Sequence, residues 1–235
     1  MCQVLRHIRL LILDLDYLVF DCALLKAQAL RQSLIAAPDD AVTGLQSPEG
    51  VNAEDGFRNH GFRWVRNIEI GLSEEGRSQL HQAYAILEKR LIDSGMGQVH
   101  SGIEEFIVHC RQSNLAVALG ADATREYMFA VIDRYRLDSL FQFALCVEEF
   151  GTGSTVEMLG EIMHQAEVNP SETLVLGTRP HFFQAAHHLD TLTVGCGWGL
   201  STHEGLAHSD FQSLTLKQLF PVIEKADAAV LRHSQ

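Results

Sequence analysis

Apolar positions follow two different spacings along this chain, and the spacing changes from one segment to the next. Residues 8–20 form a nearly continuous apolar run interrupted by two acids, a pattern typical of a strand buried in a parallel sheet. At residues 22–37 the apolar positions recur every three or four residues, which predicts a helix. Residues 38–56 are polar with several Gly and Pro and predict a loop, and residues 57–70 and 73–94 again predict helices.

After Gly95, Gly97 and Gly102, short strands and helices begin to alternate. Strands are predicted at residues 115–119, 143–147, 173–176 and 192–195, the last of them the final strand, and helices at residues 103–112, 125–135, 156–166 and 182–189. Such alternation with short turns is typical of a parallel sheet wound by right-handed crossovers. The predicted fold is therefore α/β, a Rossmannoid parallel-sheet core domain (residues 1–20 and 98–235) with an inserted helical cap domain (residues 21–97).

In an open parallel sheet, ligands collect at the carboxyl ends of the strands, so the residues after each strand are the first candidates for a site. These are residues 14–18, 119–122, 148–154 and 177–181. Asp14 and Asp16 need an explanation, because a carboxylate at the end of a buried strand is costly unless it is paired, hydrogen-bonded or bound to a cation. The alternative interpretation is that one or both acids cap the following helix.

Residues 11–21, which read LILDLDYLVFD, resemble the first motif of the haloacid dehalogenase (HAD)-like hydrolase superfamily, in particular its phosphoglycolate-phosphatase-like branch. Further landmarks follow in the family's order at residues 102–106, 115–127, 137–141, 148–153, 173–177 and 195–199. The resemblance implies the core-and-cap fold and phosphoryl transfer from a small phosphorylated molecule, with Asp14 as nucleophile and Asp16 as general acid and base. It also implies Mg²⁺ as the cofactor, held by an acid pair in the fourth motif.

The chain departs from the family pattern in all four motifs. The first motif lacks its usual Gly and Thr, the second its Ser or Thr, the third its Lys, and the fourth both of its acids. In these places stand Tyr17 and Leu18, Leu119 and Gly120, Ser154, and Thr178 and Phe182, respectively. Because residues 90–216 contain no lysine and residues 173–189 contain no acid, a neighbouring position cannot supply either role.

These losses bear on the rate that the site can support. One pair of unit charges ~4 Å apart at an effective dielectric of ~20 is worth about 4 kcal/mol, and each ~1.4 kcal/mol of lost transition-state stabilisation slows a reaction tenfold. We therefore expect that the site does not support efficient metal-assisted phosphatase chemistry. Arg179 and Arg125 lie near strand ends and are candidate replacement charges, although a solvated arginine is the more usual interpretation.

The candidate site residues fall into three groups. Asp14 and Asp16 are the catalytic candidates, as working or vestigial groups, and they are also the metal ligands if a cation binds. The candidate substrate- or anion-binding residues are Gly120, Ser154, Thr178 and Arg179. A structure in which Phe182 or Arg179 fills the place of the cation would favour a pseudo-enzyme.

Two other kinds of site find less support. His181, His187 and His188 fall close together and suggest a metal site, but adjacent helix positions point to different faces, so solvated histidines are the favoured interpretation. Neither Ser154 nor Cys146 has a base suitably placed for nucleophilic catalysis. The apolar cap residues are favoured as helix packing, with the lining of a cap/core pocket as the alternative; they are Phe57, Phe62, Trp64, Val65 and Ile68.

Composition and charge narrow the range of partners. The chain has 235 residues with 18 basic and 30 acidic side chains, and its net charge of −12 argues against nucleic acid and against an anionic membrane surface as partners. The predicted cap has 8 basic and 11 acidic residues, net −3, which leaves −9 on the core. Scattered cysteines without a C-x-x-C spacing predict reduced thiols and a cytoplasmic location, and no stretch approaches the ~18 apolar residues of a spanning helix.

The resemblance and its departures together lead to one functional hypothesis and two alternatives. The hypothesis is a degenerate HAD-like protein, a pseudo-phosphatase with a ligand- or protein-binding role in the cap/core cleft. The first alternative is an active hydrolase of small phosphate esters that forms a phosphoaspartate at Asp14. The second is a structural or assembly subunit. The expected partner is accordingly a small phosphorylated molecule or another protein.

Overall fold

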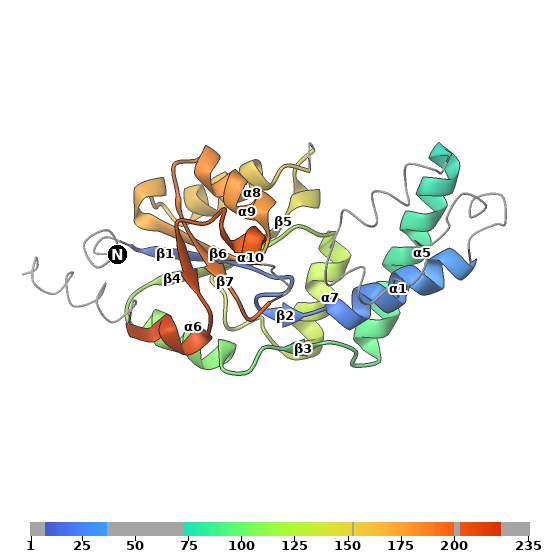
Figure 1. Cartoon of the computed structure of the whole chain (residues 1–235), viewed down its shortest axis with the longest axis horizontal. Helices are drawn as coiled ribbons and strands as arrows, with labels where there is room; N and C mark the ends of the chain where they lie inside the picture. Colours follow the sequence, from blue (N-terminus) through green and yellow to red (C-terminus); the bar gives the residue numbers. More distant parts are fainter. Residues whose placement is uncertain (1–7, 37–72, 152, 200–202, 222–235) are drawn as a thin grey trace, which may run out of the picture. The chain divides into compact units, whose positions relative to one another are not determined.

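The computed structural model describes residues 8–36, 73–151, 153–199 and 203–221 (Figure 1). It separates the chain into two compact units, the larger formed by Met1–Asp21 with Val99–Gln235 and the smaller by Cys22–Gln98. We describe each unit by itself. The assignment of the two units as core and cap remains a prediction.

The larger unit is built on a six-stranded sheet in which every neighbouring pair is parallel. Its strands, in spatial order, are β5 (Phe143–Cys146), β4 (Ala116–Ala121), β1 (Leu10–Asp14), β6 (Thr173–Gly177), β7 (Leu192–Cys196) and β8 (Phe211–Ser213). Each step along the chain between these strands is a crossover, since parallel strands cannot be joined by a tight hairpin. The predicted α/β class with a parallel-sheet core is confirmed.

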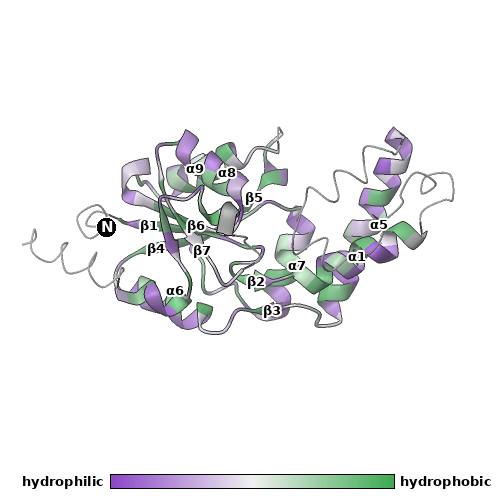
Figure 2. Cartoon of the chain, in the orientation of Figure 1, coloured by the Kyte–Doolittle hydropathy of each residue, from purple (hydrophilic) through white to green (hydrophobic). Residues whose placement is uncertain are grey.

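Helices cover both faces of this sheet. In Figure 1, α8 (Thr155–Gln165) and α9 (Pro180–His188) lie above the sheet and α6 (Ile103–Gln112) lies below it. Side chains of β1 alternate between the faces, so Leu10 and Ile12 join the cluster under α8 and α9. The rest of that cluster is Ala118, Met158, Leu159, Ile162, Met163, Val168, Val175, Phe182, Ala185 and Ala186. Figure 2 shows the same central strands as a largely hydrophobic layer.

The composition of residues 8–20 suggested a single buried strand, but the structure divides this apolar run into two strands and a turn. β1 ends at Asp14, residues 15–19 form a tight turn in which Tyr17 has a φ of 64°, and β2 (Phe20–Asp21) follows. The backbone N–H groups of Val19 and Phe20 both donate to the carbonyl of Leu15, which closes the turn. Because the turn is as deeply buried as the strand, hydrophobicity alone did not distinguish the two.

Other boundaries agree more closely with the sequence. The helices predicted at residues 103–112 and 125–135 are present as α6 and α7 (Arg125–Tyr135). The strand at residues 192–195 is not the final one, because the short strand β8 follows it and completes the sheet. The two-residue strands β2 and β3 (Gln98–Val99), which form a second sheet, were also missed because they are too short to show a period.

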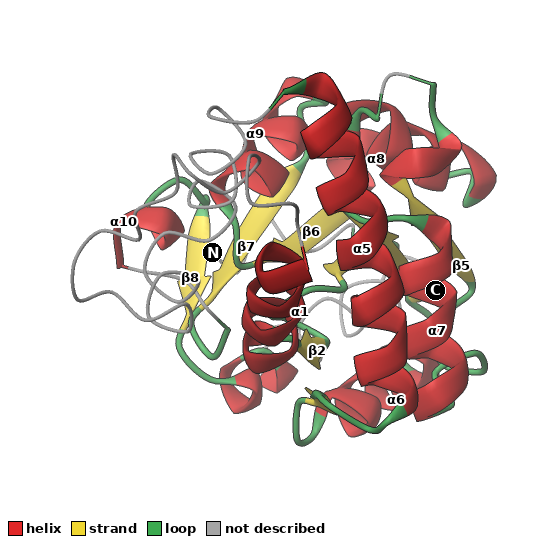
Figure 3. Cartoon of the chain, turned by 90° about the vertical axis from the view of Figure 1, so that its right-hand side faces the viewer, coloured by secondary structure: helices red, strands yellow, loops and turns green. Residues whose placement is uncertain are grey.

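In the described part of the smaller unit, two helices pack against each other, α1 (Ala23–Ala36) and α5 (Glu74–Asp93) (Figure 3). Both were predicted from apolar spacing. The hydroxyl of Ser73 caps α5 by accepting a hydrogen bond from the Gly76 N–H at 3.1 Å. A buried ion pair joins the helices, since Nζ of Lys26 lies 3.3 Å from Oε1 of Glu88.

Some sequence predictions concern residues outside the described ranges. The loop at residues 38–56, the helix at residues 57–70 and the apolar cap residues from Phe57 to Ile68 are among them. Within the described ranges, no helix combines the length and the apolar character needed to cross a membrane. The cysteines there are free and buried; they are Cys22, Cys110, Cys146 and Cys196. The cytoplasmic location remains a prediction.

Candidate functional site

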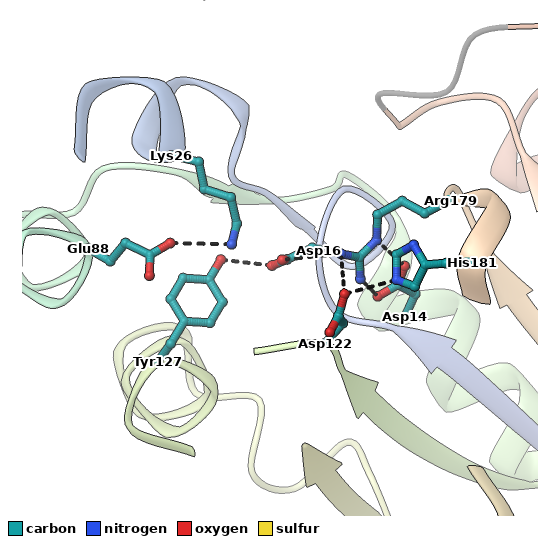
Figure 4. A network of polar contacts seen from close by, with 8 residues as sticks. All are labelled: Asp14, Asp16, Lys26, Glu88, Asp122, Tyr127, Arg179 and His181. Carbon is teal, nitrogen blue, oxygen red and sulfur yellow. Dashed lines mark hydrogen bonds and ion pairs between the residues drawn. The ribbon is translucent and has the colours of Figure 1, made fainter. Parts of the chain in front are cut away.

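The carboxyl ends of the three central strands of the larger unit bring four polar side chains together (Figure 4). Strand β1 lies between β4 and β6, so the residues that follow these strands meet at one edge of the sheet. Asp14 is the last residue of β1 and Asp16 lies in the turn after it. Asp122 follows β4 and Arg179 follows β6. The sheet register therefore assembles three carboxylates around one guanidinium.

Arg179 holds both carboxylate oxygens of Asp14. Its Nε donates to Oδ2 at 3.0 Å and its Nη2 donates to Oδ1 at 2.6 Å. Asp14 is fully buried and the Arg179 side chain is only 12% exposed. Fork-like pairs of this kind are the strong ones among charged hydrogen bonds, because two parallel N–H groups match the two oxygens. The expectation of a solvated Arg179 is therefore wrong.

The remaining nitrogen of the Arg179 guanidinium faces the other two acids. Its Nη1 lies 3.5 Å from Oδ2 of Asp122 and 3.9 Å from Oδ2 of Asp16. By contrast, Arg125 is exposed, and its guanidinium lies over the ring of Phe129, 5.3 Å from the ring centroid. Of the two candidate replacement charges, only Arg179 belongs to the site.

Two further interactions at the site were not foreseen from the sequence. The buried hydroxyl of Tyr127, on the first turn of α7, donates to Oδ1 of Asp16 at 2.8 Å. Nε2 of His181, on the first turn of α9, lies 2.9 Å from Oδ2 of Asp122. Asp122 and His181 fall within the strand-end segments singled out above. Their positions directly after predicted strands were therefore the available signal. Nothing in the sequence indicates that His181 contacts Asp122, or that Tyr127 contacts Asp16.

Burial and charge act in opposite directions on the central pair. Burial raises the pKa of the Asp14 carboxyl to about 6, with a further increase from the neighbouring Asp16, although Arg179 opposes the rise. Burial lowers the pKa of Arg179, but the charges of Asp14 and Asp16 outweigh it and leave the pKa above its ordinary value. Near neutral pH both Asp14 and Arg179 are therefore ionised, and Asp14 becomes protonated when the pH falls below about 6.

The other predicted anion-binding residues have different surroundings. Gly120 pairs with Asp14 in the β1–β4 register and contacts the ring of Phe182, so that an added Cβ would lie 3.1 Å from that ring. Ser154 is the N-cap of α8, and its hydroxyl accepts from the Glu157 N–H at 3.3 Å. Thr178 directly follows β6 and is buried. Arg179, the fourth candidate, places its guanidinium among the three carboxylates.

The residues present do not fit the Mg²⁺ ion that the resemblance implies. Both oxygens of Asp14 already accept hydrogen bonds from a cation, and residues 173–189, which contain β6 and the fourth-motif positions after it, include no acid. Phe182, at the second fourth-motif position, has no exposed surface and belongs to the apolar core. In the described residues, no group of three or more His, Cys, Asp or Glu side chains is arranged to hold a metal ion.

The predicted histidine cluster is likewise divided. His187 lies 3.1 Å from both Oγ1 of Thr193 and Oδ2 of Asp210, away from the partner of His181. Asp210 also accepts from the backbone N–H and the hydroxyl of Thr193 at 2.9 and 2.8 Å. This arrangement links α9, β7 and the segment before β8. Among the described residues, these side chains form a hydrogen-bonded network.

No family model and no curated protein matches the chain. Solved structures do match. A haloacid dehalogenase-like family hydrolase from Streptococcus pneumoniae is 13% identical at a TM-score of 0.73, covering 97% of this chain and 99% of its own. A structure described as a predicted phosphoglycolate phosphatase from Haemophilus somnus is 14% identical at a TM-score of 0.67, covering 97% of this chain and 99% of its own.

A third similar structure carries a ligand. CbbY from Rhodobacter sphaeroides in complex with phosphate is 13% identical to this chain at a TM-score of 0.72, covering 90% of this chain and 96% of its own. A mutant of the same protein was solved with xylulose-1,5-bisphosphate. These matches span nearly the whole chain at low sequence identity, so they show that the fold is similar. The predicted resemblance to HAD-like hydrolases is confirmed at that level.

Proposed function

We propose that this chain is a catalytically impaired protein of the HAD-like fold that binds a small phosphorylated molecule without efficient hydrolysis. The observation that carries the proposal is the Arg179 guanidinium on both oxygens of Asp14. The HAD-like fold of the larger unit and the phosphorylated ligands of CbbY support the ligand class.

The Asp14–Arg179 pair weakens the group that would attack phosphorus. A nucleophilic carboxylate has to direct an oxygen lone pair at the phosphoryl group, and a guanidinium that hydrogen-bonds both oxygens withdraws electron density from them. Moving Arg179 aside would leave a buried carboxylate without its counter-charge. The ground state of the site is thus stabilised against attack.

The charge around the site is also unfavourable for phosphoryl transfer. Asp14, Asp16 and Asp122 carry three formal negative charges against the single positive charge of Arg179. Phosphoryl transfer depends on fixed positive charge around the transferred oxygens, and residues 90–216 contain no lysine to supply it. We therefore expect Asp16, held by Tyr127, to be a structural remnant of an acid–base residue.

Phosphate release tests the proposal. The wild type and the Asp14→Asn variant are assayed with p-nitrophenyl phosphate and small sugar phosphates, with and without Mg²⁺, and Asp133→Asn, an exposed acid on α7, serves as the matched control. We expect all three proteins to stay at the background rate. Turnover by the wild type and the control more than about tenfold above Asp14→Asn would correspond to ~1.4 kcal/mol of catalysis through Asp14 and would overturn the proposal.

Ligand binding is measured separately through thermal stability. A ligand that binds only the native state raises the melting temperature by an amount that grows with the logarithm of its concentration relative to its dissociation constant. We expect a concentration-dependent rise in melting temperature with inorganic phosphate or a sugar phosphate, and no phosphate release. If none of these compounds shifts the melting temperature, the binding part of the proposal is wrong and an assembly role becomes the better hypothesis.

A further inference from the structure

Arg179 lies at the centre of the acidic cluster of the larger unit (Figure 4). We infer that its guanidinium is the resident cation of this site, that it takes over on Asp14 the role of a divalent metal, and that it keeps Mg²⁺ from binding there. The inference rests on the proposed function in that both concern Asp14. It is a statement about the charge of the site, however, and its test has outcomes of its own.

The contacts are those of a bound cation. The guanidinium is within 2.6 and 3.0 Å of the two Asp14 oxygens and within 3.5 and 3.9 Å of one oxygen each of Asp122 and Asp16. One planar cation thus lies within 3.9 Å of all three carboxylates, which follow or end two neighbouring strands, β1 and β4. Buried charges persist where they are paired, and this pairing supplies the reason that Asp14 and Asp16 can lie in the interior.

The fold leaves Arg179 little freedom to move out of the site. Strand β6 ends at Gly177 and α9 begins at Pro180, so only two residues connect them. Phe182 fixes the start of α9, because its fully buried side chain packs against both Gly120 and Gly177. The guanidinium is therefore placed by the connection itself and by the core beneath it.

A divalent cation would have to compete with this arrangement. Mg²⁺ in proteins is usually bound by one or two carboxylates and several waters in strict octahedral geometry. The carboxylate best placed to bind it, Asp14, has both oxygens occupied by a positive group, which would also repel a dication. Removal of the guanidinium would free Asp14 and leave Asp16 beside it, a pair of ligands of the kind that Mg²⁺ accepts.

The experiment compares the effect of MgCl₂ on the melting temperatures of three proteins, with NaCl at matched ionic strength as the salt control. They are the wild type, Arg179→Ala and Arg125→Ala, the last an exposed arginine as the matched control. We expect no change beyond that in matched NaCl for the wild type or for Arg125→Ala. For Arg179→Ala we expect a lower melting temperature without Mg²⁺ and a rise of about 5–10 °C when Mg²⁺ is ~100-fold above its dissociation constant. The added substitution Asp14→Asn should abolish that rise.

Each outcome decides the inference. A rise in the wild type beyond that in matched NaCl, which Asp14→Asn removes, would show that Mg²⁺ binds beside Arg179 and would overturn the inference. A folded Arg179→Ala protein without any response to Mg²⁺ would overturn it as well, because the guanidinium would then not be in a cation's place. If Arg179→Ala does not fold, Arg179→Gln, which keeps a hydrogen-bonding amide but no charge, gives the same comparison.

A second measurement uses the guanidinium ion itself. Guanidinium at concentrations far below those that denature proteins should raise the melting temperature of the Arg179→Ala or Arg179→Gln variant and leave the wild type unchanged. The absence of this rescue would count against the inference. Phosphate release decides the proposed function separately: turnover without Mg²⁺ would overturn the proposed function alone, and Mg²⁺ binding without turnover would overturn this inference alone.

Discussion

Replacing Asp14 by asparagine tests whether burial or the Arg179 charge dominates the energetics of this carboxyl. The substitution keeps the shape of the side chain and removes the titration. Burial raises the pKa of Asp14 from 3.8 to about 6, despite Arg179. Because the pKa of Asp14 is higher in the folded protein than in the unfolded chain, Asp14 is protonated to a greater extent in the folded protein between pH 3.8 and about pH 6. The contribution of Asp14 to stability therefore grows as the pH falls through about 6 and is lost as the pH rises again.

The expected size follows from the shift. A rise from 3.8 to about 6 is about 2.2 units, and at ~1.36 kcal/mol per unit it corresponds to about 3 kcal/mol. The free energy of unfolding of the wild type, minus that of Asp14→Asn, should increase by most of this amount between about pH 7.5 and about pH 4, and the rest is gained below pH 3.8, the unfolded-state pKa. Urea unfolding at several pH values gives both free energies, and taking their difference removes the titration of groups that the two proteins share.

Asp210→Asn provides a contrast of opposite sign. Burial raises the pKa of Asp210, but hydrogen bonds from Thr193 and the nearby His187 outweigh it and leave the pKa below its ordinary value. The stabilisation from Asp210 should therefore be lost as the pH falls, and the corresponding difference should decrease. If the Asp14 difference also decreases, or stays constant within about 1 kcal/mol, Arg179 stabilises the carboxylate more than burial destabilises it, and the reasoning is refuted.

Further predictions concern single contacts, each measured as a change in the free energy of unfolding. Tyr127→Phe removes the buried hydrogen bond to Asp16 and should cost about 1.5–3 kcal/mol; an unchanged value would show that Asp16 does not depend on it. Lys26→Met leaves Glu88 buried without its counter-charge and should cost about 3–5 kcal/mol, whereas adding Glu88→Leu should restore much of the loss. Gly195→Ala places a Cβ 2.5 Å from the hydroxyl oxygen of Ser209, which cannot easily move away because it is hydrogen-bonded to two backbone carbonyls. This substitution should cost about 1–3 kcal/mol.

The local pattern of the sequence was enough to predict most of the sheet and its helices. Apolar runs and helical spacings are properties of neighbouring residues, and they gave α6 and α7 at their observed bounds. They failed where the signal was short or ambiguous. β8 has three residues, and the turn after Asp14 is as apolar as the strand before it.

The position of the candidate site could also be predicted, because parallel strands direct the residues after them to one edge. Asp14 and Asp16 were found in this way, whereas the replacement of the fourth-motif acids by Thr178 and Phe182 followed from the resemblance to the HAD-like family. The partners could not be found. Tyr127 is 111 residues from Asp16 along the chain, and no local pattern connects the two.

The sequence by itself determined the fold class, the two acids at the end of the first strand and the absence of a fourth-motif acid pair. Only the tertiary structure decided where the charge of Arg179 goes. Because arginine side chains are mostly exposed in proteins, the sequence favoured a solvated Arg179. Arg179 lies 165 residues from Asp14, and the β1–β6 pairing brings them together. Their interaction depends on burial and on charges from other strands, which exist only once the sheet has formed.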